Sequence, residues 1–269
     1  MKEVKYGRRG VLSRMGAAAV LLGSGWLSSC DGGNGQAVGA TTVPSQPVEP
    51  PDPLASWYQG GFSGKSVAFW GNSTVSNAVY FFDQLRTHAA RGGLLEGLDT
   101  ARILNLGSNG ASLAALLAGQ GAFPVTAVIA ARPDLLVIRG PLINDVRLGG
   151  ASMEQASRLL ALALDEIRAG SPGTAILLTT ENSLLSVDAA GYGYVQPADA
   201  AQRYTDILHS AVMAMAGRFP NVRVLDVMGL LYGIASVPQS PLMADQIHPN
   251  EAGQRAEANL IAEVVGRRA

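Results

Sequence analysis

From about residue 57 onward, short apolar runs alternate with longer segments in which apolar residues recur at helical spacing. The short runs predict strands at 66–70, 101–106, 135–139, 174–180 and 222–226. The longer segments predict helices at 74–90, 112–117, 125–131, 152–169, 198–218 and 251–267. Strands that are apolar on both faces and separated by helices indicate a parallel sheet covered on each side. We therefore expect a three-layer α/β/α sandwich around a five-stranded parallel sheet.

The first 30 residues follow a different pattern, in which basic residues precede an apolar stretch at 15–27. This stretch is shorter than the roughly 20 residues of a membrane-spanning helix, so it indicates a signal peptide. The pair Arg8-Arg9 resembles a twin-arginine export signal. The residues that end at Cys30, Leu-Ser-Ser-Cys, resemble a bacterial lipobox, in which the cysteine is acylated and becomes the first mature residue. An ordinary buried thiol is the alternative.

These features predict a signal peptide at 1–30, a linker at 31–56 and a single folded domain at 57–269. The linker is inferred from its Gly, Thr, Gln, Val and Pro content, which cannot bury a core and is typical of a semi-extended spacer. Acyl chains on Cys30 would hold the protein on a membrane. We expect an exported lipoprotein of the bacterial cell envelope.

Composition narrows the function classes. The chain is 48% hydrophobic and 15% charged with a net charge of -1, which excludes a disordered protein. No basic cluster follows the N-terminal segment, so nucleic acid is not an expected partner. One cysteine and three histidines leave few ligands for a transition metal, and we expect no metal site.

Candidate chemistry gathers after the predicted strands, where open α/β sheets bind ligands. The first strand is followed by Gly-Asn-Ser-Thr at 71–74, and the second by Gly-Ser-Asn-Gly at 107–110. The third is followed by Gly-Pro-Leu-Ile-Asn-Asp at 140–145. Past the fifth strand comes Asp-Gln-Ile-His-Pro-Asn at 245–250, with Ala-Gly at 252–253 in a helix start.

In this order, the four segments resemble the four blocks of the SGNH/GDSL hydrolases, a family of serine esterases and lipases. The resemblance covers about residues 65–265 and implies the fold of that family, an α/β/α sandwich of flavodoxin-like winding. Position by position, it implies that Ser73 is the nucleophile and that Asp245 and His248 complete a triad. It further implies an oxyanion hole formed by Ser73, Gly110 and Asn144.

The sequence departs from the family pattern at two places. Asn72 replaces the usual aspartate, which removes a carboxylate beside the nucleophile. The third block, usually Gly-x-Asn-Asp, is stretched, which puts Gly140 in doubt as a functional match.

The chemistry of these residue types agrees with the implied roles. A serine hydroxyl is a poor nucleophile until a base removes its proton, and histidine titrates near neutral pH. A carboxylate such as Asp245 fixes the tautomer of His248 and stabilises the imidazolium. The backbone N–H groups of Ser73 and Gly110 and the amide of Asn144 are suitable oxyanion donors. These roles need no cofactor, and we expect hydrolysis of carboxylic esters through an acyl-serine intermediate.

Taken one at a time, the same residues have structural explanations. Ser73 could be a helix N-cap, Asn144 a turn former, Gly110 a loop glycine and Asp245 with His248 a surface pair. At the level of the protein, a non-catalytic glycan- or lipid-binding module and an acyltransferase remain open as alternatives.

Four other positions carry weaker expectations. His88 and His209 lie in helical patterns and are expected to be packed or surface residues. Arg139 and Arg147 flank the third block and could meet an anionic substrate, although a structural or solvated role is favoured. The segment 181–197 is a candidate for part of the pocket rim. The ester substrate itself, an acylated glycan, a lipid or a small ester, is left open.

Overall fold

A computed structural model describes residues 52–184, 198–235 and 240–266, all of which lie in a compact unit that spans Val48–Ala269. The signal peptide, Cys30, most of the linker and the residues 185–197 lie outside the described residues. Within the described residues, no helix is long and apolar enough to cross a membrane. The same part of the chain holds no group of three or more histidine, cysteine, aspartate or glutamate residues arranged to bind a metal.

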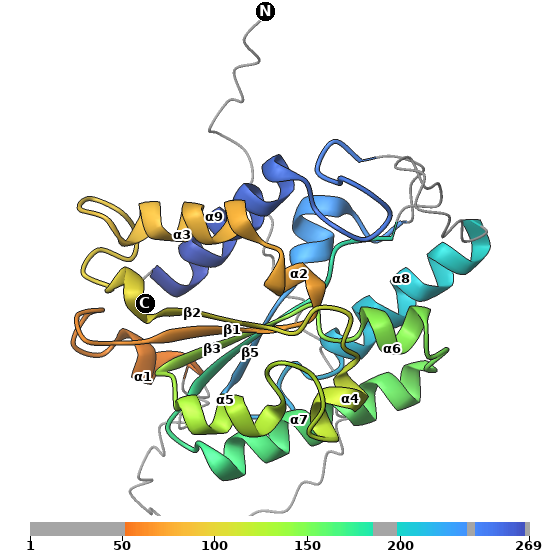
Figure 1. Ribbon diagram of the computed structural model, residues 1–269, viewed down its shortest axis with the longest axis horizontal. Helices are drawn as coiled ribbons and strands as arrows, with labels where there is room; N and C mark the ends of the chain where they lie inside the picture. Colours follow the sequence, from red (N-terminus) through yellow and green to blue (C-terminus); the bar gives the residue numbers. More distant parts are fainter. Residues whose placement is uncertain (1–51, 185–197, 236–239, 267–269) are drawn as a thin grey trace, which may run out of the picture. The chain divides into compact units, whose positions relative to one another are not determined.

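The centre of the fold is a five-stranded parallel sheet with the order β2-β1-β3-β4-β5 (Figure 1). Every strand pair is parallel and in continuous register. This is the flavodoxin-like order, in which the chain reverses direction across the sheet beside β1. The expected fold class is therefore confirmed. The strands are β1 (Val67–Gly71), β2 (Ile103–Gly107), β3 (Leu135–Arg139), β4 (Ala175–Thr179) and β5 (Val222–Leu225).

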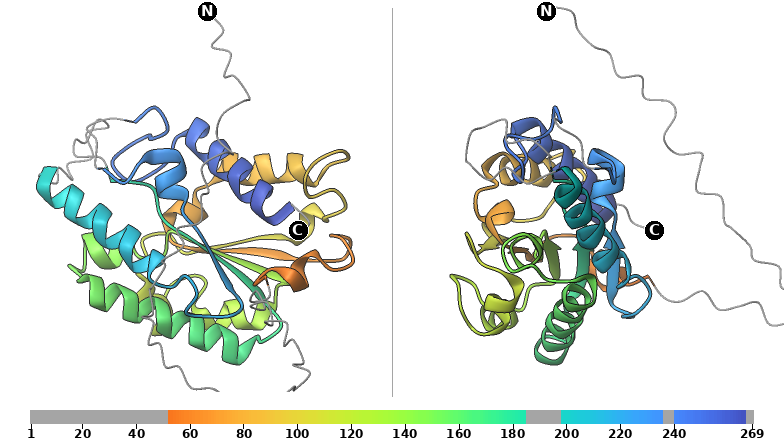
Figure 2. Two further views of the ribbon diagram at one scale, coloured as in Figure 1. Left: turned by 180° about the vertical axis from the view of Figure 1, so that it is seen from behind. Right: turned by 90° about the vertical axis from the view of Figure 1, so that its right-hand side faces the viewer.

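Helices cover both faces of this sheet. The views from the front and from behind place α3 and α9 together on one face and α5, α7 and α8 on the other (Figures 1 and 2). Shorter helices lie at the ends of the strands. The helices are α1 (Ala55–Tyr58), α2 (Ser73–Ser76), α3 (Val79–Ala89), α4 (Leu113–Leu117), α5 (Val125–Ala131), α6 (Ile143–Arg147), α7 (Met153–Gly170), α8 (Ala198–Met213) and α9 (Glu251–Gly266).

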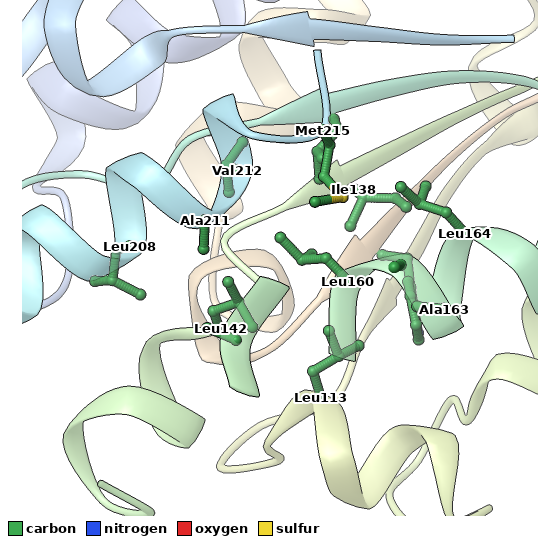
Figure 3. Packing of buried hydrophobic residues seen from close by; sticks show 14 of the residues in the cluster. Leu113, Ile138, Leu142, Leu160, Ala163, Leu164, Leu208, Ala211, Val212 and Met215 are labelled. Atoms are coloured by element: carbon green, nitrogen blue, oxygen red, sulfur yellow. The ribbon is translucent and has the colours of Figure 1, made fainter. Parts of the chain in front are cut away.

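The core consists of two apolar clusters, one on each face of the sheet. Successive strand side chains point to opposite faces, so β3 contributes Leu136 and Ile138 to one cluster and Leu135 and Val137 to the other. The first cluster includes side chains of α4, α7 and α8 that meet over the sheet (Figure 3). Burial on both faces explains why the strands read as continuous apolar runs.

Two elements differ from the sequence prediction. The helix expected at 74–90 is instead two helices, α2 and α3. The backbone of α2 lies so close to β2 that a Cβ atom at Gly107 would lie 2.2 Å from the Ser76 nitrogen. The third block, expected as a loop, contains the short helix α6. Its first turn is held by Glu181, a residue from the loop after β4 that accepts hydrogen bonds from two of its backbone N–H groups. No local pattern could show that contact.

Candidate active site

Ser73 lies at the carboxyl end of β1 as the first residue of α2 and is 9% exposed. The turn before it requires glycine, because a Cβ atom at Gly71 would lie 2.1 Å from the carbonyl oxygen of Arg139. The helix is capped by Asn72, whose Oδ1 accepts a hydrogen bond from the Thr74 backbone N–H. The N-cap explanation therefore belongs to Asn72, and the hydroxyl of Ser73 remains available for other contacts.

That hydroxyl meets an imidazole from the far end of the chain. Ser73 Oγ lies 3.0 Å from His248 Nε2, and His248 Nδ1 lies 2.8 Å from Asp245 Oδ2. The other oxygen of Asp245 accepts hydrogen bonds of 2.7 Å from the backbone N–H groups of Ile247 and His248. The loop before α9 thus holds the carboxylate, and the carboxylate orients the ring toward the serine.

The surroundings keep Asp245 ionised. Partial burial raises its pKa, but the hydrogen bonds from the His248 ring and from the backbone N–H groups of Ile247 and His248 outweigh this effect and lower the pKa. A carboxylate that stays charged beside Nδ1 favours the tautomer with the proton on Nδ1, which leaves Nε2 free to accept a proton from Ser73.

Gly110 and Asn144 line the same cavity, whose volume is about 650 Å³. Gly110 has a φ of +72°, a conformation that favours glycine, and no atom lies within 4 Å of the position of a Cβ there. Asn144 is buried and donates one amide hydrogen to the Ala111 carbonyl oxygen at 2.8 Å. Its second amide hydrogen is available to a ligand. Within the described residues, the backbone N–H groups of Ser73 and Gly110 donate to no protein acceptor.

Asp145 joins the second block to the third. Its carboxylate accepts hydrogen bonds from the backbone N–H groups of Leu113 at 2.6 Å and Ala114 at 3.0 Å, at the start of α4. Burial raises its pKa, and these hydrogen bonds partly offset the rise. The contact fixes the loop that carries Gly110 against the helix that carries Asn144. The sequence shows Asp145 as part of the third block, but no local pattern indicates this role.

The structure explains why residue 72 is an asparagine in place of the aspartate that is usual in the family. Its Oδ1 accepts from both the backbone N–H and the hydroxyl of Thr74, at 3.0 and 3.1 Å, and its amide donates to the carbonyl oxygen of Gly140. A carboxylate has no hydrogen to donate to that carbonyl. The amide therefore ties the end of β1 to the end of β3.

Arg139 has a structural role, which is the role that the sequence favours over contact with an anionic substrate. Its side chain is buried, forms an ion pair with Glu257 of α9, donates to the Thr74 carbonyl oxygen and stacks on Phe81 at 4.7 Å from the ring centroid. It does not face the candidate pocket. Arg147 is the last residue of α6 and is partly buried.

The other two histidines do not contact Ser73 in the described part of the chain. His88 lies 2.8 Å from Asn259 Oδ1, and His209 lies 3.1 Å from Asp226 Oδ2. Both are packed or surface residues, as their helical patterns predict.

Comparison with known proteins gives the family and the fold. Residues 69–256 match the GDSL-like Lipase/Acylhydrolase family. No curated protein matches the chain. A GDSL-like lipase from Bacteroides thetaiotaomicron is 18% identical with a TM-score of 0.51, and the match covers 75% of this chain and 87% of that one.

Two carbohydrate-active esterases have a similar fold. The Clostridium thermocellum family 3 carbohydrate esterase is 13% identical with a TM-score of 0.52, covering 76% of this chain and 99% of that one. The acetyl xylan esterase AlAXEase is 14% identical with a TM-score of 0.53, covering 74% and 99%. At such identities the likeness is one of fold.

Proposed function

The chain belongs to the GDSL-like lipase/acylhydrolase family, and on that premise we propose that it hydrolyses carboxylic esters through a covalent acyl intermediate on Ser73. One observation carries the proposal. The hydroxyl, the imidazole and the carboxylate form a continuous line of contacts, with 3.0 Å from Ser73 Oγ to His248 Nε2 and 2.8 Å from His248 Nδ1 to Asp245 Oδ2. The first distance is within hydrogen-bond reach of a general base that takes the serine proton, and the second is that of a hydrogen bond that orients the imidazole.

The reaction follows from this order of groups. As Ser73 Oγ attacks the ester carbonyl carbon, its proton passes to His248 Nε2, and Asp245 stabilises the resulting imidazolium. The tetrahedral intermediate collapses, the bond to the alcohol breaks, and the alcohol leaves with the proton from His248. Water then enters, gives a proton to His248 and attacks the acyl carbon, and the acid is released as Ser73 regains its proton.

We propose three donors for the oxyanion. These are the backbone N–H groups of Ser73 and Gly110, which donate to no acceptor within the described residues, and the second amide hydrogen of Asn144. Such donors are typically worth about 10² to 10³ in rate each. Asp145 supports two of them, because it fixes α4 and the Gly110 loop relative to α6.

The cavity lined by Gly110 and Asn144 is large enough to hold either the acyl group or the alcohol group of the ester. Its wall combines apolar side chains with polar ones, and its volume of about 650 Å³ lies within the range of small-molecule sites. Because two proteins of similar fold are described as a carbohydrate esterase and an acetyl xylan esterase, acylated glycans are included with lipids and small esters among the proposed substrates.

Hydrolysis of p-nitrophenyl acetate, butyrate and octanoate tests the proposal, using the protein without residues 1–47. We expect turnover that Ser73→Ala reduces by at least about 10³-fold, as for loss of a triad member. Ser76→Ala is the matched control, since Ser76 lies in the same short helix and its hydroxyl bonds only to Asn77 within the described residues. Full activity in Ser73→Ala would refute the assignment.

The two alternatives give different results in the same assay. A non-catalytic binding module would show no turnover on any ester while binding glycan or lipid ligands. An acyltransferase would pass the acyl group to an added sugar or alcohol acceptor, whereas a hydrolase releases the free acid in its presence.

We also propose that Cys30 carries a lipid anchor that holds the exported protein on a membrane of the cell envelope. The support is the lipobox-like sequence that ends at Cys30 directly after the apolar stretch. Cys30→Ala is expected to release most of the protein into the soluble fraction after cell lysis, because lasting attachment needs more than one acyl chain. Unchanged membrane association of this variant would contradict the proposal.

A further inference from the structure

A group of buried and partly buried polar side chains, which the proposed reaction does not use, includes Thr74, the residue after Ser73. We call it the buried polar cluster, and it consists of Thr74, Arg139, Glu181, Tyr232 and Glu257. The carboxylate of Glu257 accepts hydrogen bonds from Arg139 Nε at 2.8 Å and from the Tyr232 hydroxyl. Within this cluster, Glu181 stands apart, because it contacts the backbone of the helix that carries Asn144.

Glu181 acts as a cap for α6 from a distance of almost 40 residues along the chain. Its Oε1 accepts hydrogen bonds from the backbone N–H groups of Leu142 at 2.7 Å and Ile143 at 2.9 Å. The residue at the N-cap position of α6, Leu142, provides no side-chain hydrogen bond of its own. Free N–H groups at a helix start need such a partner, and the next residue of the helix is Asn144.

The side chain of Glu181 also lines a small cavity together with Thr74 of α2, the helix that begins at Ser73. Glu181 is 3% exposed, and Oε2 has no hydrogen-bond partner within the described residues. The cavity has a volume of about 10 Å³, close to the space that one water molecule needs, and Thr74 and Arg139 also line it. A Cβ atom at Gly140 would contact both Thr74 and Glu181, so only a glycine permits this approach.

We propose that Glu181 is a positioning residue for ester hydrolysis: its carboxyl group fixes the first turn of α6 and thereby places the Asn144 amide at the oxyanion. The inference rests on the proposed function. It assigns to a residue outside the four family blocks the task of preorganising one of the oxyanion donors. A preorganised donor stabilises the transition state more than one that must reorient.

The protonation state of Glu181 should make kcat depend on pH. Arg139 of β3, Glu257 of α9 and Asp145 of α6 are the charged groups that face it, and Arg139 is already paired with Glu257. Burial is the main cause that raises the pKa of Glu181 to about 8. At neutral pH the group is therefore largely uncharged. Above pH 8 it becomes an anion at the start of α6, the helix that carries the Asn144 donor, where it opposes the negative charge of the oxyanion.

Two variants separate positioning from charge. Glu181→Gln keeps an acceptor for both N–H groups and cannot ionise, so kcat at pH 7 should stay within about 5-fold of wild type. Its kcat should no longer fall between pH 7.5 and 9.5, as that of the wild type should. Glu181→Ala removes the acceptor, and we expect kcat to fall by about 10- to 100-fold with KM nearly unchanged, in line with partial loss of one oxyanion donor.

Controls make each outcome decisive. Glu251→Gln carries the same substitution at an exposed position of α9 and should keep the wild-type profile, and circular dichroism checks the fold of each variant. An alkaline fall that persists in Glu181→Gln, or wild-type kcat in Glu181→Ala, would overturn the proposal. If Glu181→Ala does not fold, the profile of Glu181→Gln decides alone. Loss of activity in Ser73→Ala with no effect at Glu181 refutes this inference and leaves the proposed function standing.

Discussion

The described part of the chain contains two histidine–aspartate pairs of similar geometry. His248 and Asp245 lie in the loop before α9, with 2.8 Å between Nδ1 and Oδ2. His209 of α8 and Asp226, directly after β5, have 3.1 Å between Nε2 and Oδ2. In both pairs the imidazole is partly exposed, and hydrogen bonds lower the pKa of the aspartate against the effect of burial. Distance and electrostatics alone do not tell them apart.

The pairs differ in what each group does with its remaining atoms. His248 uses Nδ1 for the aspartate and presents Nε2 to Ser73, whereas His209 uses Nε2 for the aspartate. Asp226 also accepts from the Thr180 hydroxyl at 3.1 Å and the Gly229 backbone N–H at 2.9 Å, which makes its pair a brace between α8 and the loop after β5. A histidine–aspartate pair thus acquires a candidate chemical role from a third group, here a serine at the end of a strand.

Replacing each histidine by glutamine tests the difference between the two pairs most directly, because glutamine keeps much of the side-chain volume. His248→Gln should lower kcat by about 10³-fold or more, because no group remains to take the proton from Ser73. His209→Gln should change kcat by less than about 3-fold, since His209 does not contact Ser73 in the described residues. Steady-state kinetics on p-nitrophenyl butyrate measures both, and equal losses in the two variants would contradict the distinction.

A second comparison replaces the aspartates. Asp245→Asn should reduce kcat by about 10²- to 10⁴-fold, because the neutral amide favours the wrong tautomer of His248 and does not stabilise the imidazolium. Asp226→Asn should leave kcat within about 5-fold and should lower the free energy of unfolding by about 1 kcal/mol through the loss of charge-assisted hydrogen bonds. Kinetics and urea unfolding at pH 7 check the two effects.

The stability effect at Asp226 should depend on pH. Its pKa in the folded protein lies below the ordinary value of 3.8, so its stabilising contribution is present above that value and lost as pH falls through the folded pKa. The difference in unfolding free energy between wild type and Asp226→Asn should therefore shrink in strong acid. If the difference in unfolding free energy stays constant down to pH 2, the stabilisation by Asp226 comes from packing and not from its charge.

The two pairs also show how far sequence reasoning reaches. His248 and Asp245 lie three residues apart in a turn, and Ser73 follows a strand, so local patterns and family resemblance were enough to nominate them. The helical pattern around His209 predicts a packed or surface residue, and His209 indeed does not contact Ser73 in the described residues. The same pattern gives no indication that His209 pairs with Asp226, 17 residues later. A contact across elements leaves no local periodicity.

The parallel sheet can be predicted from the amino-acid order, because strands buried on both faces must be apolar throughout, and the strand expected at 135–139 has those bounds in the structure. The polar segments that follow the strands can be predicted in the same way. Three features become visible only in the folded chain: α6 is a helix capped by Glu181, Asn72 joins β1 to β3, and Arg139 pairs with Glu257. These features depend on hydrogen bonds between groups 38 to 118 residues apart, which form because the folded chain buries both partners and an unpaired buried polar group costs free energy.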